Sequence, residues 1–170
     1  MSLMRAFVVV LLLLTLGCGA PPAGEREVVR REGEADVYLV RETDEEMNRA
    51  IEEARRTLTL FLAALQSPKP GRSGFSVKHP FRQGEQVEHM WVGDVSFDGS
   101  VFRGTLDNAP RNLTNVEAGQ EVEVPASQVS DWMYVEDGRL VGGYTLRVLH
   151  KQFTEEEKRA AEEAYGFKIE

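Results

Sequence analysis

The sequence predicts an α+β fold in which one long amphipathic helix packs on a curved antiparallel sheet, with a short helix near the C-terminus. Between residues 43 and 68, apolar side chains recur at spacings of three and four, which is the period of one helix face. From Gly74 onward the apolar pattern alternates, as in strands, and the turn sequences Asp98-Gly99 and Asp137-Gly138 interrupt it. Hairpin-linked strands flanked by helices are typical of an antiparallel α+β fold.

The N-terminal segment has the composition of an export signal that ends at the only cysteine of the chain. Arg5 precedes an apolar run over residues 6–16, which is shorter than the roughly 20 residues needed to cross a bilayer. Thr15-Leu16-Gly17-Cys18 resembles a bacterial lipobox, although that motif usually carries Leu where Thr15 stands. The sequence therefore predicts a signal peptide over residues 1–17 and lipid attachment at Cys18. The alternative is an ordinary signal peptide that ends near a cysteine.

Attached lipid is the expected contact of the protein with a membrane. Each buried CH₂ group contributes about 0.8 kcal/mol, so two or more acyl chains give a stable anchor. The residue after the cysteine is Gly19 and not Asp, which favours the periplasmic face of the outer membrane if the host is Gram-negative. We therefore expect a lipid-anchored protein of the cell envelope. Because the chain has one cysteine, no intramolecular disulfide is available and burial alone holds the core.

Composition divides the rest of the chain into a tether and a folded part. Residues 18–35 contain prolines, glycines and mixed charges with few apolar groups, which predicts a flexible lipidated tether. Residues 36–170 are expected to form a single α+β domain. Arg5 leaves with the signal, so 20 − 1 = 19 basic residues remain against 28 acidic ones, a net charge of −9. Nucleic-acid phosphates repel such a protein, so no nucleic-acid partner is expected.

The long helix has recognisable ends and one broad apolar face, and a short strand over residues 36–41 precedes it. Thr43 and Glu46 have the spacing of a capping box at its start, and Pro68 ends it. We interpret the apolar stripe as a core face and not as a partner-binding face. The stripe consists of Met47, Ala50, Ile51, Ala54, Leu58, Phe61, Leu62 and Leu65.

The strands are predicted by alternation and by turn residues. We expect strands over residues 75–81, 86–97, 101–106, 120–124, 129–135 and 139–141. In the second of these, unbroken alternation places Trp91 in the core, on one face with Val87, His89, Val95 and Phe97. Gly142-Gly143 is expected to be a bulge or a close backbone contact, after which residues 144–149 continue the strand. Thr154 is expected to cap a last helix that ends near Tyr165.

Several short motifs, taken in their order along the chain, resemble the YegJ-like bacterial family of unknown function. They are Phe75-Ser76-Val77-Lys78, Glu88-His89-Met90-Trp91-Val92, Phe102-Arg103-Gly104-Thr105-Leu106-Asp107-Asn108, Ser130-Asp131-Trp132-Met133-Tyr134 and Gly142-Gly143-Tyr144-Thr145. The resemblance covers the long helix to about Leu149. It implies a small α+β domain that is often exported, with no established activity and no catalytic residues to carry over.

The polar residues do not form a known catalytic or metal-binding motif. The three histidines fall in separate segments without HExxH or CxxC spacing, so no metal and no cofactor is expected. Glu88 and Asp131 could form a general acid–base pair of an envelope hydrolase. Alternatively, both carboxylates fix tryptophans or backbone groups, an interpretation that favours a protein without enzymatic activity.

The aromatic residues of the strand over 129–135 suggest a binding surface instead. Ser130, Trp132 and Tyr134 share one face, and the nearby glycine pair allows a backbone or a ligand to approach closely. We expect Asp131, Trp132 and Gly142 to form one local cluster. The candidate binding surface consists of Lys78, Glu88, Trp91, Asp131, Trp132, Tyr134, Gly142 and Gly143.

These observations favour a lipid-anchored binding or accessory domain that contacts an envelope protein or a small ligand through its sheet. The first alternative is the envelope hydrolase that uses Glu88 and Asp131. A second alternative is an immunity-type inhibitor, a role that small single-domain bacterial proteins often have.

The lipobox predicts the effect of one substitution. Cys18→Ser removes the thiol to which lipid would be attached, so the protein should leave the membrane fraction while its domain stays folded. Fractionation followed by immunoblotting measures this. A Cys18→Ser protein that stays with membranes at the wild-type level would show that the lipoprotein interpretation is wrong.

Overall fold

The computed structural model describes residues 27–29, 37–39, 45–67 and 69–169. The helices of these residues are α1 (Glu45–Leu65), α2 (Tyr144–His150) and α3 (Glu155–Tyr165), and a 3-10 turn spans Ala126–Gln128. Their strands are β1 (Glu27–Val29), β2 (Val37–Leu39), β3 (Arg72–Gln83), β4 (Gln86–Phe97), β5 (Val101–Leu106), β6 (Glu121–Pro125), β7 (Asp131–Glu136) and β8 (Arg139–Gly142).

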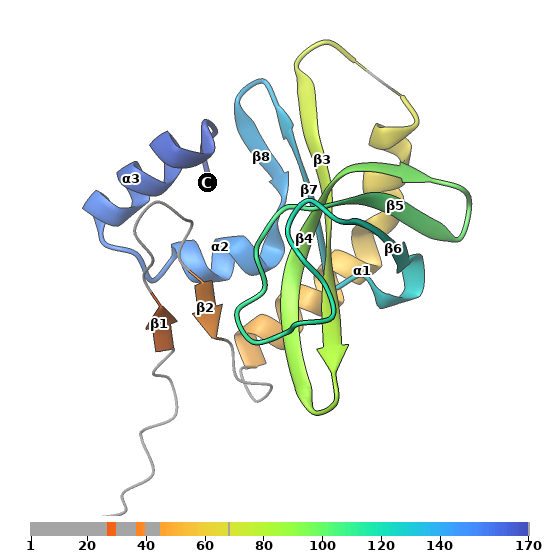
Figure 1. Ribbon diagram of the computed structural model, residues 1–170. Coiled ribbons are helices and arrows are strands. Elements are labelled where there is room, and N and C mark those ends of the chain that lie inside the picture. The colour runs from red at the N-terminus through yellow and green to blue at the C-terminus, as the bar shows by residue number, and fades with distance from the viewer. Residues whose placement is uncertain (1–26, 30–36, 40–44, 68, 170) are drawn as a thin grey trace, which may run out of the picture.

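Strands β3 to β8 form one antiparallel sheet in the order β6-β5-β4-β3-β7-β8. Strand β7 pairs with β3 and not with β6, which precedes it in the chain, so β3 lies in the middle of the sheet. Helix α1 lies against one face of this sheet, and α2 and α3 lie beyond β8 (Figure 1). The predicted α+β fold with an antiparallel sheet is therefore confirmed, with a further helix, α2, that the sequence pattern did not indicate.

The core lies between α1 and the sheet. Phe61 of α1 is fully buried, and its ring centroid lies 5.5 Å from that of Trp132, 5.8 Å from Phe75 and 5.9 Å from Phe102. The indole nitrogen of Trp132 donates a hydrogen bond of 2.9 Å to the carbonyl oxygen of Ala54. Aromatic pairs at these separations contribute beyond their buried area. The apolar stripe of the long helix is thus a core face, as the sequence indicated.

The prediction that Trp91 lies in the core is wrong. A register shift between Gly93 and Ser96 interrupts the pairing of β4 with β5, and Asp94 has a φ of +50°. A bulge adds a residue and so reverses the alternation of side chains. Met90 and Val92 before the bulge therefore share the α1 side with Val95 after it. Trp91 points to the opposite face and is only partly buried.

The prediction that residues 144–149 continue a strand is also wrong, because they form α2. Gly142 and Gly143 adopt left-handed backbone angles, with φ of +75° and +62°, and these angles turn the chain out of the sheet. Three backbone N–H groups near the start of α2 have partners outside the helix, as described below. The β-branched residues of this segment favour a strand locally, and these tertiary contacts override that preference.

The sequence predicted the start of the last helix but not the strand pairing near the N-terminus. The capping box at Thr154 and Glu157 is present, so the start of α3 is confirmed. Residues 27–29, within the segment expected to be a tether, pair as a short antiparallel ribbon with residues 37–39. The predicted cap at Thr43 lies outside the described residues.

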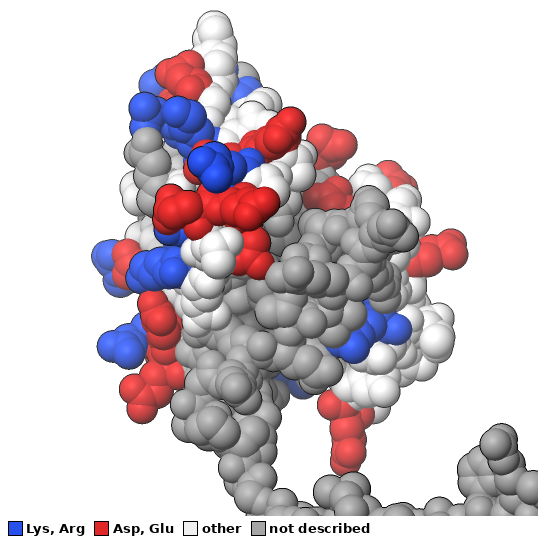
Figure 2. Space-filling model, turned by 90° about the vertical axis from the view of Figure 1, so that its left-hand side faces the viewer, with Lys and Arg blue, Asp and Glu red and all other residues white. Residues whose placement is uncertain are grey.

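The C-terminal segment and α2 cover the outer edge of β8. The backbone N–H of Leu140 donates to the Lys168 carbonyl oxygen at 2.9 Å. The Arg147 side chain donates to the carbonyl oxygens of Leu140 and Gly142 at 2.7 and 2.8 Å. Covered strand edges do not template pairing with other chains. On the side of the molecule shown in Figure 2, acidic and basic side chains of the described residues lie interspersed.

Truncation of Phe61 tests the core. Phe61→Ala should reduce the free energy of unfolding by about 3–5 kcal/mol, because it leaves a cavity among three aromatic rings. Leu58→Ala should cost less, because Leu58 is only partly buried against the same core. The matched control is Leu60→Ala, since Leu60 is 62% exposed on the same helix and its truncation should change stability little. Urea denaturation that gives equal losses for Phe61→Ala and Leu60→Ala would contradict this packing.

Candidate functional site

The carboxylate of Asp131 joins β7 to the start of α2. Its side chain is fully buried, and its Oδ1 atom accepts the backbone N–H groups of Trp132 and Tyr144 at 2.8 and 3.1 Å. Its Oδ2 atom accepts the N–H and the hydroxyl of Thr145 at 2.8 and 2.6 Å. Four donated hydrogen bonds thus surround one buried carboxylate, which is the requirement for burying such a charge.

Lys78 supplies the nearby positive charge. Its Nζ atom donates to Thr145 Oγ1 at 3.1 Å and lies 5.2 Å from the centroid of the Trp91 ring. In the sheet register, Lys78 lies between Trp91 on β4 and Asp131 on β7, so the three side chains share the face opposite α1. Burial lowers the pKa of Lys78, and Asp131 raises it. Burial raises the pKa of Asp131, and the bonds from Thr145 together with Lys78 act in the opposite direction.

A histidine lies next to this cluster. His89 Nδ1 is 3.0 Å from Ser130 Oγ, which itself donates to the carbonyl oxygen of Lys78 at 3.2 Å. Burial, followed by the charge of Lys78, lowers the pKa of His89 to about 4. The imidazole is therefore neutral at physiological pH. Because Ser130 is fully buried, its hydroxyl serves the structure and is closed to a substrate.

The glycine pair lies against Trp132, so the expected cluster of Asp131, Trp132 and Gly142 is present. A Cβ atom on Gly142 would lie 2.3 Å from the Trp132 carbonyl oxygen and 2.5 Å from its ring. The Gly143 N–H donates to the same carbonyl oxygen at 2.8 Å. The close backbone contact expected at this position thus exists, and the group that approaches is Trp132.

Glu88 has a different role from Asp131. Its carboxylate accepts the backbone N–H groups of Arg111, Asn112 and Leu113 at 2.7, 2.5 and 3.2 Å. These bonds hold the loop between β5 and β6. Glu88 lies opposite Phe81, whereas Asp131 lies opposite Lys78, on the other side of β3. The structure therefore separates the two carboxylates and occupies both with backbone donors.

The eight residues of the predicted binding surface do not share one surface. Lys78, Trp91 and Asp131 lie on the face opposite α1, whereas Trp132 and Tyr134 lie under α1. The prediction of a single surface over the sheet therefore does not hold as a whole.

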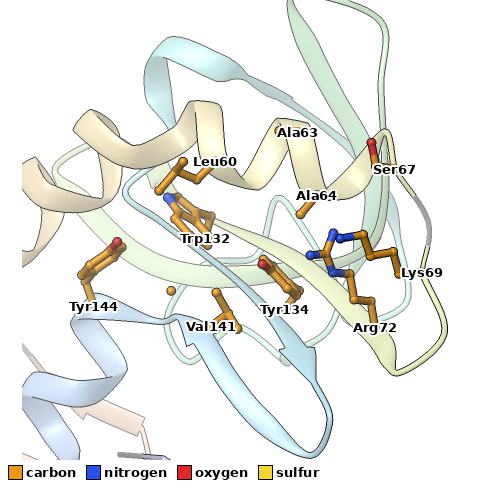
Figure 3. Close-up of a pocket in the computed structure, with 11 residues that line it drawn as sticks. Leu60, Ala63, Ala64, Ser67, Lys69, Arg72, Trp132, Tyr134, Val141 and Tyr144 are labelled. Atoms are coloured by element: carbon orange, nitrogen blue, oxygen red, sulfur yellow. The ribbon is translucent and has the colours of Figure 1, made fainter.

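A groove runs between α1 and the β7–β8 hairpin, and we call it the α1–hairpin groove (Figure 3). It has a volume of about 510 Å³ and is open to solvent along one side. Trp132, Tyr134 and Gly142 from the predicted surface line it. Its other lining residues are Leu60, Ala63, Ala64, Ser67, Lys69, Arg72, Val141 and Tyr144.

Sequence reasoning missed the α1 side of this groove. Leu60 is an apolar residue outside the core stripe of the helix, and it is the one large apolar side chain among the described residues that is strongly exposed. That departure from the stripe was the available signal. Nothing in the sequence indicated that β8 and α2 would bring Val141 and Tyr144 opposite it.

The described residues contain no group of three or more His, Cys, Asp or Glu that could hold a metal ion. None of the helices in these residues is long and apolar enough to span a membrane.

Comparison with known proteins assigns the chain to a family. Residues 44–169 match the family described as "Uncharacterized protein conserved in bacteria (DUF2314)", so the chain belongs to it. The protein YegJ of Escherichia coli K12 is 35% identical over 111 residues, which are 65% of this chain and 71% of that protein. The resemblance to the YegJ-like family is thereby confirmed.

A second relative comes from Neisseria meningitidis serogroup B and is named "Putative ankyrin repeat protein". It is 41% identical over 142 residues, which are 79% of this chain. The match spans 56% of that relative, so the chain corresponds to little more than half of its length. No solved structure matches the chain significantly.

The geometry of Asp131 predicts a structural role for it. Asp131→Asn replaces one acceptor oxygen by an NH₂ group that faces other donors, so it should lower the free energy of unfolding by about 1.5–3 kcal/mol. Glu121→Gln is the matched control, because Glu121 is exposed on the edge strand β6. Thermal and urea denaturation measure the change. An Asp131→Asn protein as stable as Glu121→Gln would exclude this structural role.

Proposed function

We propose that this protein is a lipid-anchored binding domain of the bacterial cell envelope, which holds an apolar segment of another envelope protein in the α1–hairpin groove. The observation that carries this proposal is the combination of an exposed Leu60 with an aromatic groove floor. A single exposed leucine is common on soluble proteins, but an exposed apolar residue that continues into an apolar groove rimmed by polar side chains is typical of an interaction site.

The open shape of the groove favours a protein segment over a small molecule. A site for a small molecule buries most of the ligand, typically about 70–90% of its surface. A groove that is open along one side, with a helix as one wall, instead suits an extended chain that continues beyond it.

The name of one relative supports a binding role, and the N-terminal motif supports a location in the envelope. The Neisseria relative is named as a putative ankyrin repeat protein, and ankyrin repeats stack into extended binding surfaces, which supports a binding role. The Leu16-Gly17-Cys18 sequence supports attachment to a membrane, with the periplasmic face of the outer membrane as the proposed location in a Gram-negative host. The hydrolase alternative lacks support, because Glu88 and Asp131 both bind backbone N–H groups.

Site-specific photocrosslinking in cells tests this function. A photoreactive amino acid at Ala63, which is exposed and lines the groove, should give one discrete adduct with an envelope protein. Leu60→Asp should abolish this adduct, because it introduces a charge into the apolar wall. Thr59→Asp is the matched control, since Thr59 is also exposed on α1 but lies outside the groove lining, and it should leave the adduct intact.

Two outcomes would contradict the proposed function. The first is the absence of any adduct from Ala63. The second is an adduct whose yield is the same in the Leu60→Asp and Thr59→Asp proteins.

A further inference from the structure

The α1–hairpin groove carries positive charge in a protein that is otherwise acidic. The whole chain has a net charge of −8, yet the residues that line the groove include two cations and no carboxylate. Both cations, Lys69 and Arg72, lie together at the end next to Tyr134, whereas Tyr144 lies toward the other end (Figure 3). The groove is therefore apolar along its length and cationic at one end.

Arg72 is held in place at this end. Its Nε atom donates to Glu136 Oε1 at 2.6 Å, and its guanidinium carbon lies 5.5 Å from the centroid of the Tyr134 ring. The side chain of Arg72 is 13% exposed. A guanidinium fixed by one carboxylate and one ring still has N–H groups that can donate to a second anion.

Lys69 adds a charge that Glu136 does not balance. It is exposed, and it forms no ion pair with any of the described residues. Two carboxylates, Glu136 and Asp137, lie near this end, the second beside Gly71. Neither of them lines the groove, whereas both cations do, so the lining at this end presents only positive charge to a bound chain. Charge complementarity of this kind fixes the register of a bound chain and increases its rate of association.

We infer that the segment bound in the groove is an acidic-ended apolar peptide. Its apolar side chain would lie against Leu60 and Val141, and a carboxylate would lie at Lys69 and Arg72. The inference rests on the proposed function and adds the chemistry and the direction of the bound segment.

Calorimetric titration of the full-length chain with two blocked peptides tests this inference. One peptide has the sequence Leu-Phe-Leu-Asp-Glu, and its neutral counterpart has the sequence Leu-Phe-Leu-Asn-Gln. At low salt the acidic peptide should bind about fivefold more tightly, as expected for one or two partly exposed ion pairs, and the difference should shrink as salt is added. Lys69→Gln should remove most of the difference, whereas Lys168→Gln, which removes an equal charge outside this groove, should preserve it.

The outcomes separate this inference from the function on which it rests. If both peptides bind with equal affinity and Leu60→Asp abolishes their binding, the inference is overturned and the proposed function stands. If neither peptide binds while the Ala63 adduct forms, the inference again fails alone. If neither binding nor the adduct is observed, both fail. Octanoate serves as a small-molecule probe. If octanoate binds in a Lys69-dependent way and neither peptide binds, the inference of a peptide ligand is overturned in favour of a small carboxylate.

Discussion

The buried carboxylate of Asp131 is the interaction on which the arrangement of the C-terminal half depends. It accepts hydrogen bonds from the N–H groups of Trp132, Tyr144 and Thr145, and thereby fixes α2 to the start of β7. An unpaired buried carboxylate would cost several kcal/mol, so the donors and Lys78 have to be present together. The position of α2 in turn places the Tyr144 hydroxyl 3.0 Å from Thr57 Oγ1 on α1, which defines one end of the groove.

The same arrangement shapes the groove floor. Gly142 has no side chain, and this allows the Trp132 ring to lie against the backbone where β8 ends. Trp132 contacts Phe61 on one side and lines the groove on the other, so the core and the proposed binding site share a residue. The Asp131 cluster consequently supports the site from the opposite face of the sheet. Substitutions in the Asp131 cluster are therefore expected to change partner binding only by moving α2 and β7.

Local patterns were sufficient for the sheet, the long helix and the cap of α3, because periodicity and capping residues act over a few positions. The bulge at Asp94 was not predictable from alternation alone, and it reversed the expected orientation of Trp91. Helix α2 was missed because its stabilising acceptor, Asp131, precedes it by 13 residues. The groove was missed for a similar reason, since Leu60 and Val141 line one groove only after the hairpin has packed on α1.

Amide hydrogen exchange at Tyr144 and Thr145 tests the central role of Asp131 most directly. N–H groups in the first turn of a helix lack partners within the helix and usually exchange rapidly. If both donate to the buried Asp131 carboxylate, they should be protected to about the same degree as the paired amides of β7. Rapid exchange at both residues, while the β7 amides remain protected, would contradict the account.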